Sequence, residues 1–91
     1  MKIKVRSFGD LMTVLGKETI IELKRNAKVK DLLSKVAQRM EGSRRGFLGR
    51  YSLELDLAIL VNGRNIAAIE KYETSLRNND TVVILPLVTG G

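Results

Sequence analysis

Near the start of the chain, the basic residues Lys2, Lys4 and Arg6 alternate with Ile3, Val5 and Ser7, and Phe8 follows them. A period of two is typical of a strand with one solvent-exposed face, so we expect a first strand here. The β-branched residues of segment 19–24 predict a second strand. Breaks at Gly9-Asp10 and Gly16-Lys17 favour a hairpin-like pair, with a short apolar segment of undetermined type at 11–15 between them.

A different period follows the second strand. Between residues 29 and 40, apolar residues recur with the three- and four-residue spacing of one helix face: Val29, Leu32, Leu33, Val36, Ala37 and Met40. The sequence therefore predicts an amphipathic helix whose apolar stripe packs on the core. Asn26 is the expected N-cap and Gly42 the expected stop signal.

The C-terminal third of the sequence predicts strands and turns. Residues 57–61 are entirely apolar and predict a buried strand, which the Asn62-Gly63 turn ends. Segment 65–69 is interpreted as a short strand, and residues 70–75 as a polar connector. A second turn at 78–80 leads into a last strand over 81–85.

This order of elements predicts an α+β fold. A mixed sheet with one main helix packed across a single face accounts for it, because the helix has one apolar stripe and the first strand alternates. That arrangement is the β-grasp, or ubiquitin-like, fold. We expect residues 1–91 to form a single domain, with a flexible tail from about residue 86 to 91.

Composition narrows the class of protein. The apolar run at 57–61 is far shorter than the ~20 residues that a membrane span requires. The alternating N-terminal segment also differs from the continuous apolar segment of a secretion signal. We therefore expect a soluble, cytoplasmic protein with no membrane partner.

The chain contains no cysteine and no histidine. Disulfides, thiolate nucleophiles and the usual zinc sites are excluded, and the commonest acid-base group near neutral pH is missing. We expect neither a metal site nor independent enzymatic activity. The net charge of +6, from 16 Lys and Arg against 10 Asp and Glu, favours an anionic partner.

Part of that charge lies in a glycine-rich segment at 42–51. Arg44, Arg45 and Arg50 are interleaved there with Phe47 and Tyr51, a combination that suits phosphates and stacked bases. The segment is short and has no RNP-type motif, which favours an ordinary surface loop. A nucleic-acid partner is therefore not the favoured interpretation, although an RNA-binding module stays open as an alternative.

The last six residues carry the most informative pattern: Pro86, Leu87, Val88, Thr89, Gly90 and Gly91. Glycine has no Cβ, so a Gly-Gly end can enter a narrow slot, and the carboxylate of Gly91 is an unhindered acyl group. Pro86 stiffens the start of the tail. The residues after it span about 17 Å when extended, enough to reach into a pocket of a partner.

These features together resemble a known family, the ubiquitin-like sulfur carriers, and within it the small subunit of molybdopterin synthase. The resemblance spans nearly the whole chain. The residues that carry it are Ile3, Lys4, Val5, Phe8, Leu32, Leu33, Val61, Asn62, Gly63, Asp80, Val82, Pro86, Val88, Thr89, Gly90 and Gly91.

The resemblance implies a carrier function. An activating enzyme would use ATP and Mg to adenylate the carboxylate of Gly91, which is then converted to a thiocarboxylate. The carrier itself binds no cofactor. It would donate its sulfur to a pterin precursor within a complex with the larger catalytic subunit of molybdopterin synthase.

A carrier needs an apolar docking surface, which we expect on the sheet face beside the tail. The candidate residues are Phe8, Leu57, Ile59 and Leu87. Two alternatives remain open at this point. One is a ubiquitin-like modifier joined to target lysines through Gly91, and the other is a sulfur carrier for tRNA thiolation or thiamine.

Overall fold

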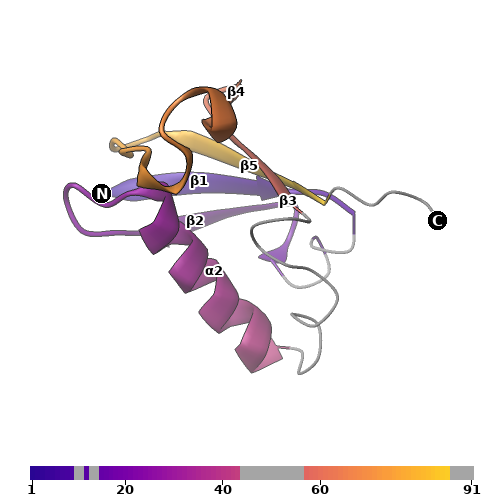
Figure 1. The fold of residues 1–91 in the computed structure, drawn as a ribbon. Helices are drawn as coiled ribbons and strands as arrows, with labels where there is room; N and C mark the ends of the chain where they lie inside the picture. Colours follow the sequence, from indigo (N-terminus) through magenta and orange to yellow (C-terminus); the bar gives the residue numbers. More distant parts are fainter. Residues whose placement is uncertain (10–11, 13–14, 44–56, 87–91) are drawn as a thin grey trace.

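Five strands form one mixed sheet in the computed structural model, which describes residues 1–9, 12, 15–43 and 57–86. A single long helix crosses one face of this sheet (Figure 1). In chain order, the elements are β1 Lys2–Ser7, β2 Glu18–Glu22, α2 Val29–Ser43, β3 Leu57–Val61, β4 Arg64–Asn65 and β5 Thr81–Pro86. The predicted β-grasp arrangement is confirmed.

The strands lie in the order β2-β1-β5-β3-β4. β1 and β2 form the expected antiparallel pair, in which Ile3 lies opposite Ile21. β5 inserts between the hairpins, parallel to β1 and antiparallel to β3. The last strand of the chain therefore occupies the centre of the sheet.

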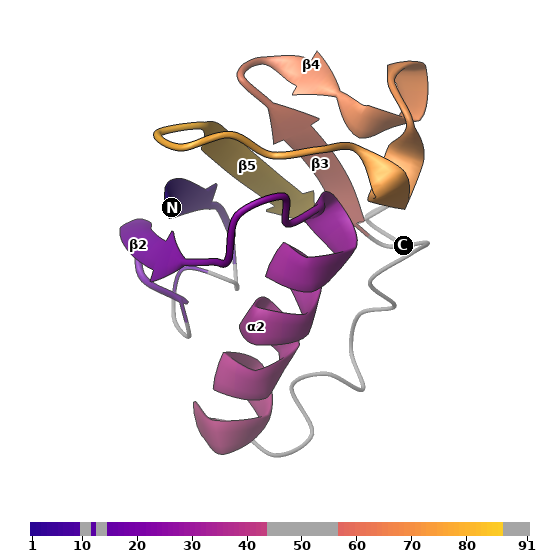
Figure 2. The same ribbon diagram turned by 90° about the vertical axis from the view of Figure 1, so that its left-hand side faces the viewer.

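Alternation along the strands decides which side chains meet the helix. Ile3 and Val5 of β1, and Val82 and Ile84 of β5, are buried on the helix side. The face of α2 that is turned towards the sheet supplies Val29, Leu32, Leu33 and Val36 to the core. Figure 2 shows α2 lying beneath the sheet, so the other sheet face has no helix over it in the described part of the chain.

The start of α2 differs from the prediction. Asn26 is not the N-cap; it adopts a positive φ of 65° in the turn before the helix. The helix begins after Lys28, whose backbone N–H donates to Oδ2 of Asp31 at 2.8 Å. This contact is the reciprocal half of a capping box, in which a side chain of the first turn reaches back to the cap position. At its other end, α2 runs to Ser43, one residue beyond Gly42.

The segment after β3 also corrects the sequence prediction. Asn62 and Gly63 both adopt positive φ, 50° and 88°, and close a two-residue turn between Val61 and Arg64. The strand that follows is only Arg64–Asn65, because residues Ile66–Ala68 turn into a 3₁₀ helix, η2. The side chain of Asn65 caps η2 by accepting the N–H of Ala67 at 2.9 Å.

The connector to β5 contains a second 3₁₀ helix, η3, at Lys71–Glu73. Glu73 pairs with two lysines of the α2 start: Lys28 at 2.8 Å and Lys30 at 2.9 Å. The backbone of Val29 also donates to the carbonyl of Thr74 at 2.9 Å. These contacts join the connector to the beginning of α2.

Several sequence predictions fall outside the described residues. They include most of the basic segment 42–51 and the tail beyond Pro86. Within the ranges that are described, no helix is long and apolar enough to cross a membrane.

Candidate functional site

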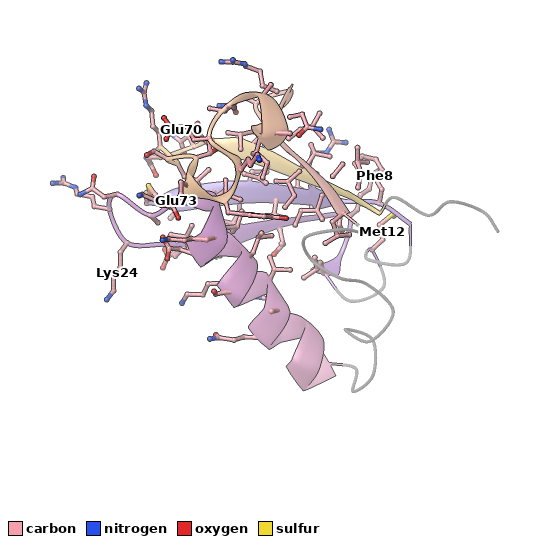
Figure 3. All side chains as sticks on the ribbon, in the orientation of Figure 1. Phe8, Met12, Lys24, Glu70 and Glu73 are labelled. Carbon is pink, nitrogen blue, oxygen red and sulfur yellow. The ribbon has the colours of Figure 1, made fainter. Side chains whose placement is uncertain are left out.

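The sheet topology determines where the C-terminal tail leaves the domain. β1 and β5 are parallel, with Ser7 paired to Ile84, so both strands finish at the same end of the sheet. β3 begins at that end, with Leu57 opposite Pro86. Figure 3 shows Phe8 at this end, beside the point where β5 finishes. Pro86, the last described residue, therefore lies at the same end of the sheet as Phe8.

Pro86 is the last residue of β5 and fits its position. The backbone N–H of Asn62 donates to the carbonyl of Thr81. The backbone groups of odd-numbered β5 residues therefore bond to β3, and those of even-numbered residues point towards β1. β1 has already ended where Pro86 lies. The missing N–H of the proline thus removes no ladder bond. The remaining tail residues, Leu87, Val88, Thr89, Gly90 and Gly91, lie outside the described residues.

The structure separates the predicted docking residues. Phe8 is 38% exposed, whereas Leu57 and Ile59 are 6% and 2% exposed and belong to the core under α2. Their docking role requires correction, because both point to the helix side of β3. The outward positions of β3 are Ala58 and Leu60, which are half-buried.

The outward residues of the central strands form an apolar patch on the uncovered sheet face. Register places Val83 of β5 between Arg6 of β1 and Leu60 of β3. We call this surface the open-face patch, and it consists of Phe8, Ala58, Leu60, Val83 and Leu85. Sequence alternation is clear only for β1, and β3 is apolar throughout, so no sequence signal identified the whole patch.

Arg6 borders the open-face patch. Its Cζ lies 5.8 Å from the centroid of the Phe8 ring, within cation–π range. Its Nε lies 3.8 Å from Oε2 of Glu18, beyond hydrogen-bond distance, and this buried nitrogen has no hydrogen-bond partner. Together with Lys2 and Lys4, which are exposed on the same strand, Arg6 makes a basic border along β1.

The chemistry available to this site is limited. The chain has no histidine or cysteine, and the described residues contain no group of three or more side chains that could hold a metal. What the arrangement offers is an apolar surface next to the start of a Gly-Gly tail. Such a surface suits docking.

Comparison with known proteins gives a consistent family. The model of the ThiS family matches residues 5–91. A protein of Archaeoglobus fulgidus, provisionally named a sulfur carrier protein, is 49% identical over 35 residues. That match spans 38% of this chain and 40% of the relative's length.

Solved structures match over nearly their full length. A Pyrococcus furiosus protein, provisionally named molybdopterin converting factor, subunit 1, is 28% identical with a TM-score of 0.75, covering 97% of this chain and 99% of its own. Small archaeal modifier protein 1 of Methanosarcina acetivorans is 28% identical at a TM-score of 0.73, with 99% and 96% covered. A chain of the Amycolatopsis orientalis BexX/CysO complex is 26% identical at 0.61, with 98% and 99% covered.

Proposed function

The chain belongs to the ThiS family, and on that premise we propose that it is a sulfur carrier with Gly91 as its terminal, reactive residue. The carboxylate of Gly91 attacks the α-phosphorus of ATP on an activating enzyme, and pyrophosphate leaves. A sulfide equivalent then displaces AMP from the acyl adenylate, which leaves a thiocarboxylate. ATP and Mg are used by the activating enzyme, and this chain serves as the acyl substrate.

The observation that supports this proposal most is the position of the tail exit. β5 finishes at the end of the sheet where Phe8 and the open-face patch lie. A partner that covers this patch is therefore beside the start of the tail. About 17 Å of extended chain then brings Gly91 into a pocket of that partner.

For the pathway, we favour molybdopterin synthesis, with this chain as the small subunit of molybdopterin synthase. The likeness to the Pyrococcus furiosus converting factor subunit supports this choice. The structure with BexX and CysO is that of a two-protein complex, in line with a larger partner for this chain. We place the reaction in the cytoplasm, where the larger catalytic subunit would receive the sulfur.

A second candidate is a protein modifier that forms an isopeptide bond between Gly91 and target lysines. The equal identity to the small archaeal modifier supports it. Both candidates begin with adenylation, and sulfur transfer to tRNA or thiamine begins in the same way. The products distinguish them: a thiocarboxylate in a carrier, a lysine adduct in a modifier.

The test is the intact mass of the full chain after expression with its activating enzyme and a sulfur source. We expect exchange of one oxygen for sulfur at Gly91. Adducts on lysines of other proteins, without this exchange, would favour the modifier. An unchanged mass together with the absence of lysine adducts, in the presence of active enzyme, ATP and sulfur, would contradict both.

The first prediction concerns the last two residues. Deleting Gly91, or changing Gly90→Val, should abolish pyrophosphate release while leaving the thermal midpoint unchanged, because neither residue belongs to the described core or to β5, Thr81–Pro86. Lys35→Ala, on the exposed side of α2, is the matched control and should release pyrophosphate normally. Normal release by the Gly91 deletion would contradict the proposal.

A further inference from the structure

β2 is one of the two edge strands of the sheet, and in the described part of the chain it pairs only with β1 (Figure 2). Met1 and Leu23 exchange two backbone hydrogen bonds, at 2.7 and 2.8 Å. Ser7 likewise donates to the carbonyl of Lys17 at 3.2 Å. Antiparallel ladder bonds recur at every second residue, so the odd-numbered residues of β2 face β1.

The even-numbered residues of β2 therefore point their backbone groups away from the sheet. These residues are Glu18, Ile20 and Glu22. Each presents an N–H and a C=O along the free edge. Such a row of unpaired groups is a template for another strand.

The side chains along this edge form a distinct pattern. Ile20 is 49% exposed, more than any other large apolar residue in the described ranges. Glu18 and Glu22 flank it on the same face and are exposed as well. An added strand would place one residue beside Ile20 and one beside each glutamate.

This pattern argues against pairing with a second copy. If two β2 edges met antiparallel with Ile20 opposite Ile20, Glu18 of each copy would lie opposite Glu22 of the other. Like charges directly opposite each other destabilise a strand pair. A partner that brings cations to these two positions avoids this repulsion.

On the other side of β2, the molecule itself pairs the two glutamates with cations. β1 places Lys2 opposite Glu22, Lys4 opposite Ile20 and Arg6 opposite Glu18. At the free edge, cations opposite the two glutamates would repeat this charge pairing. An apolar residue opposite Ile20, where β1 has Lys4, would cover its exposed side chain. Side chains on the far face of an added strand have room, because a groove of about 760 Å³ lies between the end of β2 and α2, lined in part by Leu23, Lys24, Ser34, Lys35 and Gln38.

We propose that the free edge of β2 binds an extended segment of a partner protein by strand addition. The segment carries Lys or Arg two residues before and two residues after a central β-branched residue. This site is separate from the open-face patch and does not depend on the proposed sulfur chemistry.

A pair of synthetic peptides tests the proposal. The basic peptide is acetyl-Thr-Lys-Thr-Ile-Thr-Lys-Thr-amide, and its matched control has Glu in place of both lysines. Titration into the labelled full chain, followed by backbone amide shifts, should show saturable changes at residues 18–22 with the basic peptide. We expect the acidic peptide to bind at least about tenfold more weakly.

Three variants test where the peptide binds. Ile20→Pro removes one edge N–H without removing a ladder bond to β1, and it should weaken binding of the basic peptide at least about tenfold. Ile20→Val keeps that N–H and should bind like the wild type. The double change Glu18→Lys and Glu22→Lys should reverse the preference between the peptides, and it tests the proposal even if Ile20→Pro does not fold.

Three results would overturn the inference: equal binding of both peptides, shifts confined to the open-face patch, or no binding of the basic peptide. Concentration-dependent dimerisation through β2, seen by sedimentation and lost in Ile20→Pro, would also overturn it, because the edge would then serve a second copy.

Discussion

At the scale of single residues, Glu73 has the most strongly shifted pKa among the described groups. Hydrogen bonds from Lys28 and Lys30 lower its pKa from 4.5 to about 2. The pKa of Lys28 is raised in turn, first by its hydrogen bond to Glu73. All three side chains are well exposed, so water and salt screen these interactions. The cluster joins η3 to the start of α2 (Figure 3).

This pKa predicts how stability depends on pH. Because the folded-state pKa of Glu73 is below its unfolded value, its contribution is present above about pH 4.5 and is lost as the pH falls towards 2. Glu73→Gln should therefore lower the urea midpoint at pH 7, and the difference from wild type should close between pH 4.5 and 2.

Glu70→Gln is the matched control for this prediction. It removes the same charge nearby, but no ion pair of Glu70 occurs among the described residues. Its midpoint should move less than that of Glu73→Gln at pH 7. Equal shifts in the two variants would show that net charge, and not the Glu73 cluster, sets the effect.

At the scale of elements, α2 is stabilised by its apolar stripe. Leu33 is 5% exposed, and truncating a buried leucine leaves a cavity in addition to the lost burial. Leu33→Ala should lower the free energy of unfolding by ~2–5 kcal/mol. Lys35→Ala should change it by no more than about 0.5 kcal/mol. Similar effects of both changes in denaturant titrations would show that the assigned helix register is wrong.

At the scale of the whole molecule, the sheet presents two separate surfaces: the open-face patch beside the tail exit and the free edge of β2. Phe8→Ala removes the most exposed aromatic side chain of the patch. It should weaken binding to the activating enzyme by at least about tenfold, or ~1.4 kcal/mol. Gln38→Ala, on the exposed side of α2, should bind normally in the same calorimetric titration. Unchanged affinity of Phe8→Ala would exclude the patch as the docking surface.

The net charge of +6 also acts at this scale. Changing Arg44, Arg45 and Arg50 together to Ala should slow association with an acidic activating enzyme modestly, without changing the final yield of thiocarboxylate, because peripheral charges act mainly on encounter rates. Stopped-flow association measurements at two salt concentrations check this. Saturable, sequence-selective RNA binding by the wild type, lost in the triple variant, would instead support a nucleic-acid function.

The sequence by itself determined the elements whose period is visible. The 3.6-residue period of α2, the alternation of β1 and the Asn62-Gly63 turn all follow from local chemistry, and the order of elements predicted the β-grasp fold. Local signals were weaker where two conformations compete. Segment 65–69 looked like a strand, but the Asn65 side chain caps η2 and ends the strand after two residues.

Only the tertiary structure decided which face of each strand is covered. All five residues of β3 are apolar, so no alternation shows whether Leu57 and Ile59 or Ala58 and Leu60 point outward. Packing against α2 buries Leu57 and Ile59, since the helix covers a single face of the sheet. The free edge of β2 is likewise a property of strand order, which depends on long-range pairing between β1 and β5. Local sequence determines the elements, and burial between distant segments determines which surfaces remain for partners.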